Sequence, residues 1–377
     1  MRRAALVGMS QVSAVGAGLD ALRAALRGPP PCPLPTAGGG PALLDSSLVG
    51  ALGTATLGNA SSPAGSLSAP QPEWVVCGGD PADRVPVLKS SARGLEKLID
   101  PRGLRRFDPF AQRVLYASLL ALRSCPGEPV PAQRVGVLVA TGRGPLMTTF
   151  QFLDETMDQR DGVAFPITFA NSVHGAAAAA VSATLGLHGP MLTITAAFSP
   201  FSEALDLALD WLDHGDADRV LLATADEFHP VLGYALSRRG GCSADGHIRA
   251  LDFATCSRVP GETFAAFVLD RADRASSRLA TVSGPVRFRG ALPASTNDDA
   301  LLFLAAAGDP AEGAAYRAAL EGRRAAAHGA LWGWSPTAEA LEVVTAALTL
   351  GDGVEGHSVR CVAMAPDGAG VLVELSR

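Results

Sequence analysis

The sequence predicts an α/β protein with a mainly parallel sheet, because strand patterns and helix patterns alternate along most of its 377 residues. Short runs rich in Val, Leu and Ile, typical of buried strands, recur from residue 134 onward. Amphipathic or Ala-rich helical patterns stand between these runs. Hydrophobic residues make up 48% of the chain, which is ample for a large core.

The elements are justified in chain order by these same patterns. Residues 28–86 are rich in Pro, Gly, Ser and Ala, and we expect an irregular surface excursion there. The elements predicted after it are a strand at 134–142, a helix at 171–186, a strand at 191–197, a helix at 199–215, and strands at 217–227 and 262–272. A shorter run then has a strand at 300–308, helices at 312–324 and 335–350, and strands at 358–366 and 368–376. The two runs agree in element order, which suggests an internal duplication.

Composition excludes several classes of function. The net charge of −6 offers no basic stripe for nucleic acid. The longest apolar stretch, 176–187, is far too short for a membrane helix, which needs about 20 residues. The six cysteines form neither a CxxC pair nor a metal-ligand cluster, and polar residues interrupt the apolar run at the N-terminus early. We therefore expect a cytoplasmic protein without a metal, and the low charged content of 18% predicts a subunit interface.

The turn before the helix at 199–215 resembles the mounting of a nucleophile. Ser199 is a natural N-cap and Pro200 a natural first helical residue, so the positive end of the helix faces Phe198. A thiol at this place would be activated by the helix, whereas a phenyl ring gains nothing from it. Ser199 and Ser202 are conceivable replacement nucleophiles, but no base for them is identifiable in the sequence.

Several blocks together resemble the β-ketoacyl synthases. They include a helix opening with Asn and Gly, the "GLHGP" that leads into a strand, and "GDAD" before the strand that closes the unit. "GLRRFDPFAQRVLYASLLAL" and "RALDFATCSRVPGETFAAFVLDRADRA" resemble further blocks of the same family. The resemblance covers most of residues 1–275, which would form the N-terminal-like half, with 276–377 as a shortened C-terminal-like half. It implies the thiolase fold, in which two duplicated halves stack as five αβαβα layers.

The same resemblance implies that the catalytic residues of the family are missing. Phe198 falls on the nucleophilic cysteine, Ala307 on the first catalytic histidine and Gly333 on the second, while His328 falls on the family's lysine. A synthase needs the thiolate to take up the acyl group and the histidines to stabilise the enolate and oxyanion. We therefore expect no catalytic residue and no activity of the chain on its own.

A synthase-like chain without this cysteine resembles the chain length factors, the non-catalytic partners of catalytic subunits in type II ketosynthase heterodimers. Many factors carry Gln where this chain carries Phe198, so Gln-type malonyl decarboxylation is not expected, and the ring either fills or gates the unused pocket. "FPITFANSVHG" and the compact second half are closest to the factors of aryl polyene and other polyene systems. The implied partners are a catalytic ketosynthase and an acyl carrier protein, and no cofactor is implied.

Two groups of residues are candidates for these contacts. The apolar stripe Leu146, Phe150, Leu153 and Met157 is either ordinary core or part of the wall of the tunnel that limits chain length at the subunit interface. The candidates for that tunnel and interface are Met147, Phe150, Leu153 and Met157. Four arginines form either a solvated helix face or a docking site for the acidic carrier protein. They are Arg102, Arg105, Arg106 and Arg113.

Two other functions stay open at the level of sequence. The chain could be a stand-alone acyltransferase or hydrolase with a displaced nucleophile. It could also be a homodimeric protein that binds an acyl chain.

Overall fold

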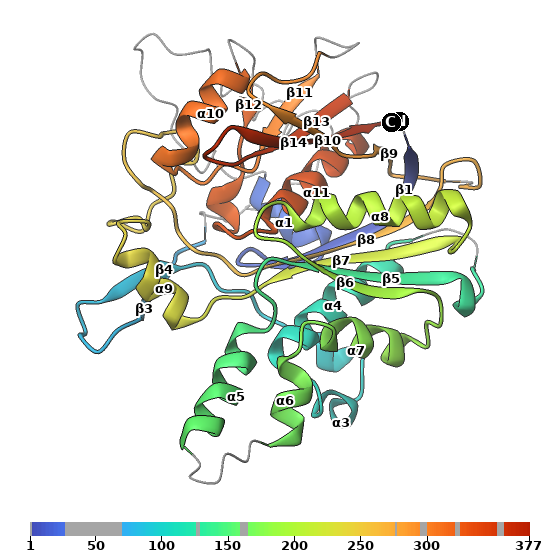
Figure 1. Cartoon of the computed structure of the whole chain (residues 1–377). Coiled ribbons are helices and arrows are strands. Elements are labelled where there is room, and N and C mark those ends of the chain that lie inside the picture. Colours follow the sequence, from blue (N-terminus) through green and yellow to red (C-terminus); the bar gives the residue numbers. More distant parts are fainter. Residues whose placement is uncertain are drawn as a thin grey trace, which may run out of the picture.

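The computed structural model describes residues 2–26, 70–125, 129–158, 165–275, 277–294, 300–320, 325–352 and 358–377. Residues 28–69 of the predicted excursion lie outside this part of the chain. The last residues of the predicted excursion form a two-stranded antiparallel ribbon of β3 (Glu73–Val76) and β4 (Arg84–Val87). Composition alone did not predict this ribbon. The other described strands join into one 12-stranded sheet that folds into two layers (Figure 1).

The first layer has the strand order β6-β5-β7-β8-β1. Its strands are β1 (Arg3–Ser13), β5 (Val135–Thr141), β6 (Met191–Thr195), β7 (Arg219–Asp226) and β8 (Thr263–Arg271), with the short β2 (Gly16–Ala17) beside β1. β5 runs parallel to both β6 and β7, whereas β8 is antiparallel to β7 and to β1. The strands predicted from the Val-rich runs are confirmed, and β6 forms one edge of the layer.

The second layer repeats the pattern of the first. Its strands are β10 (Val286–Arg289), β11 (Leu301–Leu304), β12 (Ala325–Ala326), β13 (Ser358–Met364) and β14 (Ala369–Ser376). β11 is parallel to β12 and β13, and β14 is antiparallel to β13 and to β10. β9 (Ala280–Ser283) pairs with both β1 and β14 and so joins the layers. The two layers share the same order of strands and the same pattern of parallel and antiparallel pairs, which supports the suggested duplication. Residue 275, where the sequence divides the halves, lies between β8 and β9.

Helices complete five layers (Figure 1). α8 (Pro200–His214) and α11 (Ala338–Gly351) lie between the two sheets, and their apolar side chains meet those of both sheets. α4 (Pro109–Arg123) and α7 (Ala176–Leu185) cover the outer face of the first sheet, and α10 (Pro310–Leu320) packs against the second. The other α-helices in the described part of the chain are α1 (Leu19–Leu26), α3 (Pro101–Leu104), α5 (Leu146–Asp158), α6 (Pro166–Ser172) and α9 (Pro230–Ser237), and short 3-10 helices lie at η1 (Leu95–Lys97), η2 (Ala132–Arg134) and η3 (Gly329–Leu331). The single helix predicted over 171–186 is wrong, since α6 ends at Ser172 and α7 begins at Ala176.

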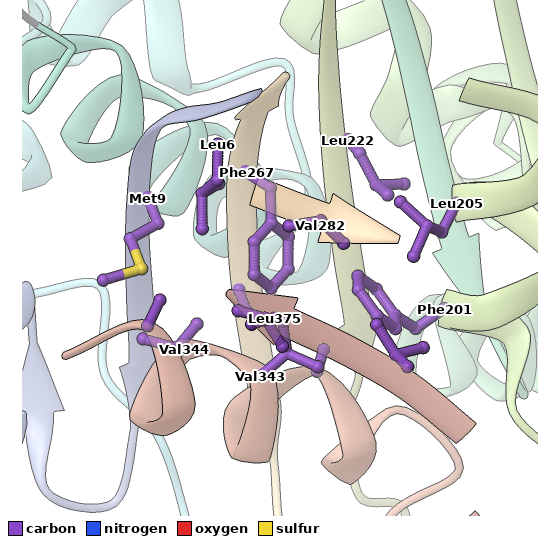
Figure 2. Packing of buried hydrophobic residues seen from close by; sticks show 14 of the residues in the cluster. Leu6, Met9, Phe201, Leu205, Leu222, Phe267, Val282, Val343, Val344 and Leu375 are labelled. Carbon is purple, nitrogen blue, oxygen red and sulfur yellow. The ribbon is translucent and has the colours of Figure 1, made fainter. Parts of the chain in front are cut away.

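The largest apolar cluster fills the space between the sheets. Figure 2 shows Phe201 and Leu205 of α8 and Val343 of α11 gathered around Phe267 of β8. α11 is buried on every side from Ala338 to Leu350, as expected for a helix that is covered by both sheets. A polar side chain in this helix must therefore find its partner inside the protein.

Candidate functional site

The turn between β6 and α8, which the sequence likens to the mounting of a nucleophile, has a strained backbone. Phe198 lies on this turn, half-buried, directly before the helix. The next residue, Ser199, has φ 49° and ψ 52° and is the only non-glycine residue with positive φ in the described chain. A left-handed conformation costs a residue with a side chain about 1–2 kcal/mol. Such strain clusters at functional sites.

The prediction that Ser199 caps α8 with its side chain is wrong. Ser199 occupies the N-cap position, but its side chain makes no capping hydrogen bond. Its hydroxyl instead donates to Oε2 of Glu339 in the first turn of α11, and the Ser202 hydroxyl donates to Oε1 of the same carboxyl at 2.7 Å. One carboxyl of the second half therefore holds two hydroxyls at the start of α8.

Glu339 is one of the most deeply buried carboxyls of the molecule, with 2% of its surface exposed. Burial raises its pKa to about 7, although the hydrogen bonds from Ser199 and Ser202 oppose the increase. The group therefore changes charge near neutral pH while two hydroxyls are bound to it.

A second buried carboxyl, that of Asp226 at the end of β7, joins the loop after β5 to the segment before α11. Its Oδ1 accepts the backbone N–H groups of Gly142 and Arg143, each at 3.1 Å, and its Oδ2 accepts the Thr337 N–H at 3.1 Å. Burial raises the Asp226 pKa, and the positive charge of Arg143 counteracts this. The Arg143 guanidinium stacks on Trp334 at 4.7 Å from the ring centre. The two halves are thus bound together at Thr337, two residues before Glu339, whose carboxyl binds Ser199.

The positions aligned with the catalytic histidines hold no imidazole. Ala307 is buried with 3% exposure and follows β11 by three residues. Gly333 has φ 82°, and a Cβ placed there would lie 2.8 Å from both the Gly261 Cα and the Val259 carbonyl oxygen. No side chain fits Gly333 with this backbone, so a histidine there would require a different path of the chain. The register of these two positions stays a prediction.

His328, aligned with the family's lysine, is bound to another carboxyl of α11. Its Nδ1 lies 2.7 Å from Oε2 of Glu342, and its backbone N–H donates to Oε1 at 2.8 Å. The ring also packs edge-on against Phe303, with 4.8 Å between the ring centres. His328 is therefore held by Glu342, which lies one turn further along α11 than Glu339, the residue that binds Ser199.

The stripe on α5 lies at the surface, so the interpretation as ordinary core is wrong. Met147, Leu153 and Met157 are 46%, 44% and 76% exposed. Phe150 is half-buried and stacks on His229, with 4.2 Å between the ring centres. Helix α6 packs beside α5 through Phe152 and Phe169, and Phe165, Ile167 and Phe169 are each more than half exposed. We call these exposed side chains of 147–157 and 165–169 the apolar face of α5 and α6.

The edge strand β6 adds a second exposed apolar feature. Its Met191 and Leu192 are each 46% exposed. β6 pairs with β5 on one side and ends the strand order on the other, so its outer backbone groups are available for another strand. Both features are typical of a subunit surface rather than of a monomer.

The arginine group is divided by the fold. Arg102, Arg105 and Arg106 are exposed on α3 and the turn after it. Arg113 points inward, with its side chain 18% exposed and ion pairs of 3.7 Å to Glu227 and 3.6 Å to Glu262. The inclusion of Arg113 in a docking surface is therefore wrong.

Glu227 also supports the start of α5. Its Oε1 accepts the Met147 N–H at 2.8 Å, and burial raises its pKa to about 8 despite the nearby Arg113. The first turn of α5 is thus fixed to the end of β7 through a buried carboxyl.

Sequence reasoning missed Glu339, Asp226 and the Arg143 stack. One signal for the first was present, because Glu339 and Glu342 interrupt an otherwise apolar helix pattern at 335–350. Charged residues are almost never fully buried unless they are paired, so two of them in a core helix indicate internal partners. Within the described ranges, no group of three or more His, Cys, Asp or Glu could hold a metal ion. The described helices also include none that is long and apolar enough to cross a bilayer.

The five-layer architecture with the duplicated strand order is the thiolase-like fold of ketosynthases, as the sequence predicts. Three solved structures are similar to the whole chain. The ishigamide ketosynthase/chain length factor gives a TM-score of 0.69 at 16% identity, covering 100% of this chain and 99% of that one. A type II PKS acyl-carrier protein in complex with its ketosynthase gives 0.65 at 13%, covering 100% and 99%. A β-ketoacyl synthase from Burkholderia phymatum gives 0.67 at 16%, covering 100% of both chains.

Sequence comparison places the similarity in the first half. Residues 90–275 match the β-ketoacyl synthase N-terminal domain. A hybrid PKS-NRPS synthetase of Botryobasidium botryosum is 28% identical over 169 residues, which are 44% of this chain and 10% of that protein. The phthioceranic/hydroxyphthioceranic acid synthase of Mycobacterium tuberculosis is 31% identical over 156 residues, 41% of this chain and 7% of that protein. The chain thus matches a small part of these long relatives.

Proposed function

We propose that this chain is a chain length factor: a non-catalytic subunit that pairs with a catalytic β-ketoacyl synthase and shapes the tunnel for the chain growing on an acyl carrier protein. The observation that carries the proposal is Phe198, which stands on a strained turn at a helix start where a synthase needs a thiolate. A phenyl ring can neither accept an acyl group nor carry charge. The chain therefore needs a partner for the chemistry.

Its exposed apolar surfaces are consistent with such a partner. The apolar face of α5 and α6 and the open edge of β6 belong to the same half as Phe198. A catalytic subunit with the same strand order would present the same edge strand, so the two sheets could continue across the interface. Burial of Met157 and its neighbours on α5 and α6 in that interface would remove a large apolar area from water.

Burial argues against the alternative of a displaced nucleophile. Ser199 is 4% exposed and Ser202 is fully buried, and both hydroxyls point to Glu339 inside the protein. An acyl thioester therefore has no access to either hydroxyl in this arrangement. We also propose, on the resemblance of residues 165–175, that the product is an aryl polyene or another polyene.

Co-expression with a candidate ketosynthase, size exclusion and an elongation assay test the proposal. We expect a one-to-one complex that elongates only as a pair. A stable homodimer that transfers acyl groups by itself would overturn the proposal, and a homodimer that binds an acyl chain without transfer would favour the binding-protein alternative.

The tunnel candidates require a second experiment. We propose that Met147, Phe150 or Met157 limits product length. Alanine at all three should lengthen the products of the reconstituted pair, because the removed side chains leave volume for the growing chain. Alanine at Trp74, which is exposed on the ribbon of β3 and β4 and lies outside the apolar face, is the matched control. An unchanged length distribution in the triple variant would remove these residues from the proposal.

A further inference from the structure

We infer that Glu339 is the positioning residue of the Phe198 turn: its carboxyl holds Ser199 in the left-handed conformation and so fixes the direction in which the Phe198 ring points. The inference deepens the proposed function, because it says what keeps the ring in place of a nucleophile. It rests on the contacts of the turn rather than on any property of a catalytic subunit.

The conformation of Ser199 needs a cause. Among the described residues it is the one non-glycine residue with positive φ, and its side chain does not form the N-cap bond that usually stabilises a serine at this position. The local sequence thus offers no compensation for the strain. The Glu339 carboxyl is the partner that the Ser199 hydroxyl has instead.

The carboxyl of Glu339 is placed where it can hold the whole first turn of α8. It accepts from Ser199 at the N-cap and from Ser202 three residues later, so both hydroxyls are fixed relative to α11. Glu339 is itself in the first turn of α11. The group therefore lies near the positive ends of two helices, which favours a carboxylate there and partly offsets its burial.

Other groups near Glu339 cannot replace it in this role. Tyr316 of α10 and Cys361 of β13 have pKa values raised by burial and remain uncharged near neutral pH. Glu203 of α8 is exposed and bound to Arg287 at 2.9 Å. Glu342, one turn further along α11, binds His328. Glu339 is thus the carboxyl that is directly bonded to the turn.

Phe198 is coupled to Ser199 through a single peptide bond. When Ser199 leaves the left-handed region, the peptide plane before it rotates, and the Phe198 Cα–Cβ bond changes direction with it. Loss of Glu339 should therefore release the ring into more than one orientation. Loss of Glu342 should not, although both are buried glutamates of one helix.

Fluorine NMR of the full chain with 4-fluorophenylalanine at position 198 tests the inference. The wild type should give one resonance, and Glu339→Ala a second one with about a tenth or more of the intensity. The wild-type resonance should also shift with pH between about pH 5.5 and 8.5, and this shift should vanish in Glu339→Gln. Glu342→Gln is the matched control and should behave as the wild type in both respects.

A single unshifted resonance in folded Glu339→Ala would overturn the inference. Where that variant does not fold, the double variant Ser199→Ala/Ser202→Ala removes the two donors instead, and a single wild-type resonance there overturns the inference equally. Failure of the proposed function is separate. If the Phe198 ring is released in Glu339→Ala but the wild-type chain elongates without a partner, the proposed chain length factor is rejected and the role of Glu339 stands. If the ring is unchanged in Glu339→Ala but elongation requires the pair, the role of Glu339 is rejected and the chain length factor stands.

Discussion

Replacement of Glu339 by Gln should remove a large part of the pH dependence of stability near neutral pH. The carboxyl has a pKa of about 7 in the folded protein, against an ordinary value of 4.5 in the unfolded chain. Because the folded state holds the proton more tightly, protonated Glu339 contributes stability that is fully present below pH 4.5. This contribution is lost as the pH rises through 7.

The magnitude follows from the two pKa values. The difference between about 7 and 4.5 corresponds to about 3 kcal/mol between pH 4.5 and pH 8. Glu227 and Glu312, with pKa values raised to about 8 and about 7, act in the same direction and remain in the variant. The useful quantity is therefore the difference between wild type and Glu339→Gln rather than the slope of either protein.

Urea unfolding followed by tryptophan fluorescence at pH 5 and pH 8 measures this difference. The wild type should lose about 3 kcal/mol more than Glu339→Gln between these pH values. Glu342→Gln leaves the Glu339 carboxyl in place and should retain the wild-type decline. Equal declines in wild type and Glu339→Gln would show that the carboxyl is not held protonated by its burial, and the reasoning would fail.

Three further predictions concern the site and the surfaces. Phe198→Cys should not elongate acyl chains alone, because neither histidine position carries an imidazole; acyl transfer by the unpartnered variant in a carrier-protein assay would contradict this. Met157→Asp should weaken the subunit complex about 5- to 30-fold in Kd, since a 76% exposed Met forfeits about 1–2 kcal/mol of burial, whereas Trp74→Asp, outside the apolar face, should leave the Kd unchanged in biolayer interferometry. Arg105→Glu with Arg106→Glu should slow turnover with the carrier protein and flatten its salt dependence; equal kinetics would remove the docking site.

The elements of the fold were predictable from local patterns, because a buried strand or helix records its burial in its own residues. β5, β7, β8 and α8 follow from their Val/Leu runs or apolar stripe alone. The stripe of α5 was misjudged for a physical reason. Periodicity shows that one face of a helix avoids water, but it does not say whether this face meets its own core or another chain.

The contacts of the site were not predictable, because they join residues far apart in the sequence. Glu339 is 140 residues from Ser199, and Arg113 finds its carboxyls 114 and 149 residues away. A serine before a proline at a helix start predicts a cap, and the local rule is sound in isolation. It failed here because a buried carboxyl competes for the hydroxyl. Only the packing of α8 against α11 brings that competitor within reach.

The end of β7 links the subunit surface to the Phe198 turn. Two adjacent carboxyls stand there, and successive side chains of a strand point in opposite directions. Glu227 accepts the backbone N–H at the start of α5, which carries the apolar face. Asp226 accepts the Thr337 N–H directly before α11, two residues from Glu339. The start of α5 and the start of α11 are therefore both hydrogen-bonded to the same strand end, although they are separated by about 190 residues of sequence.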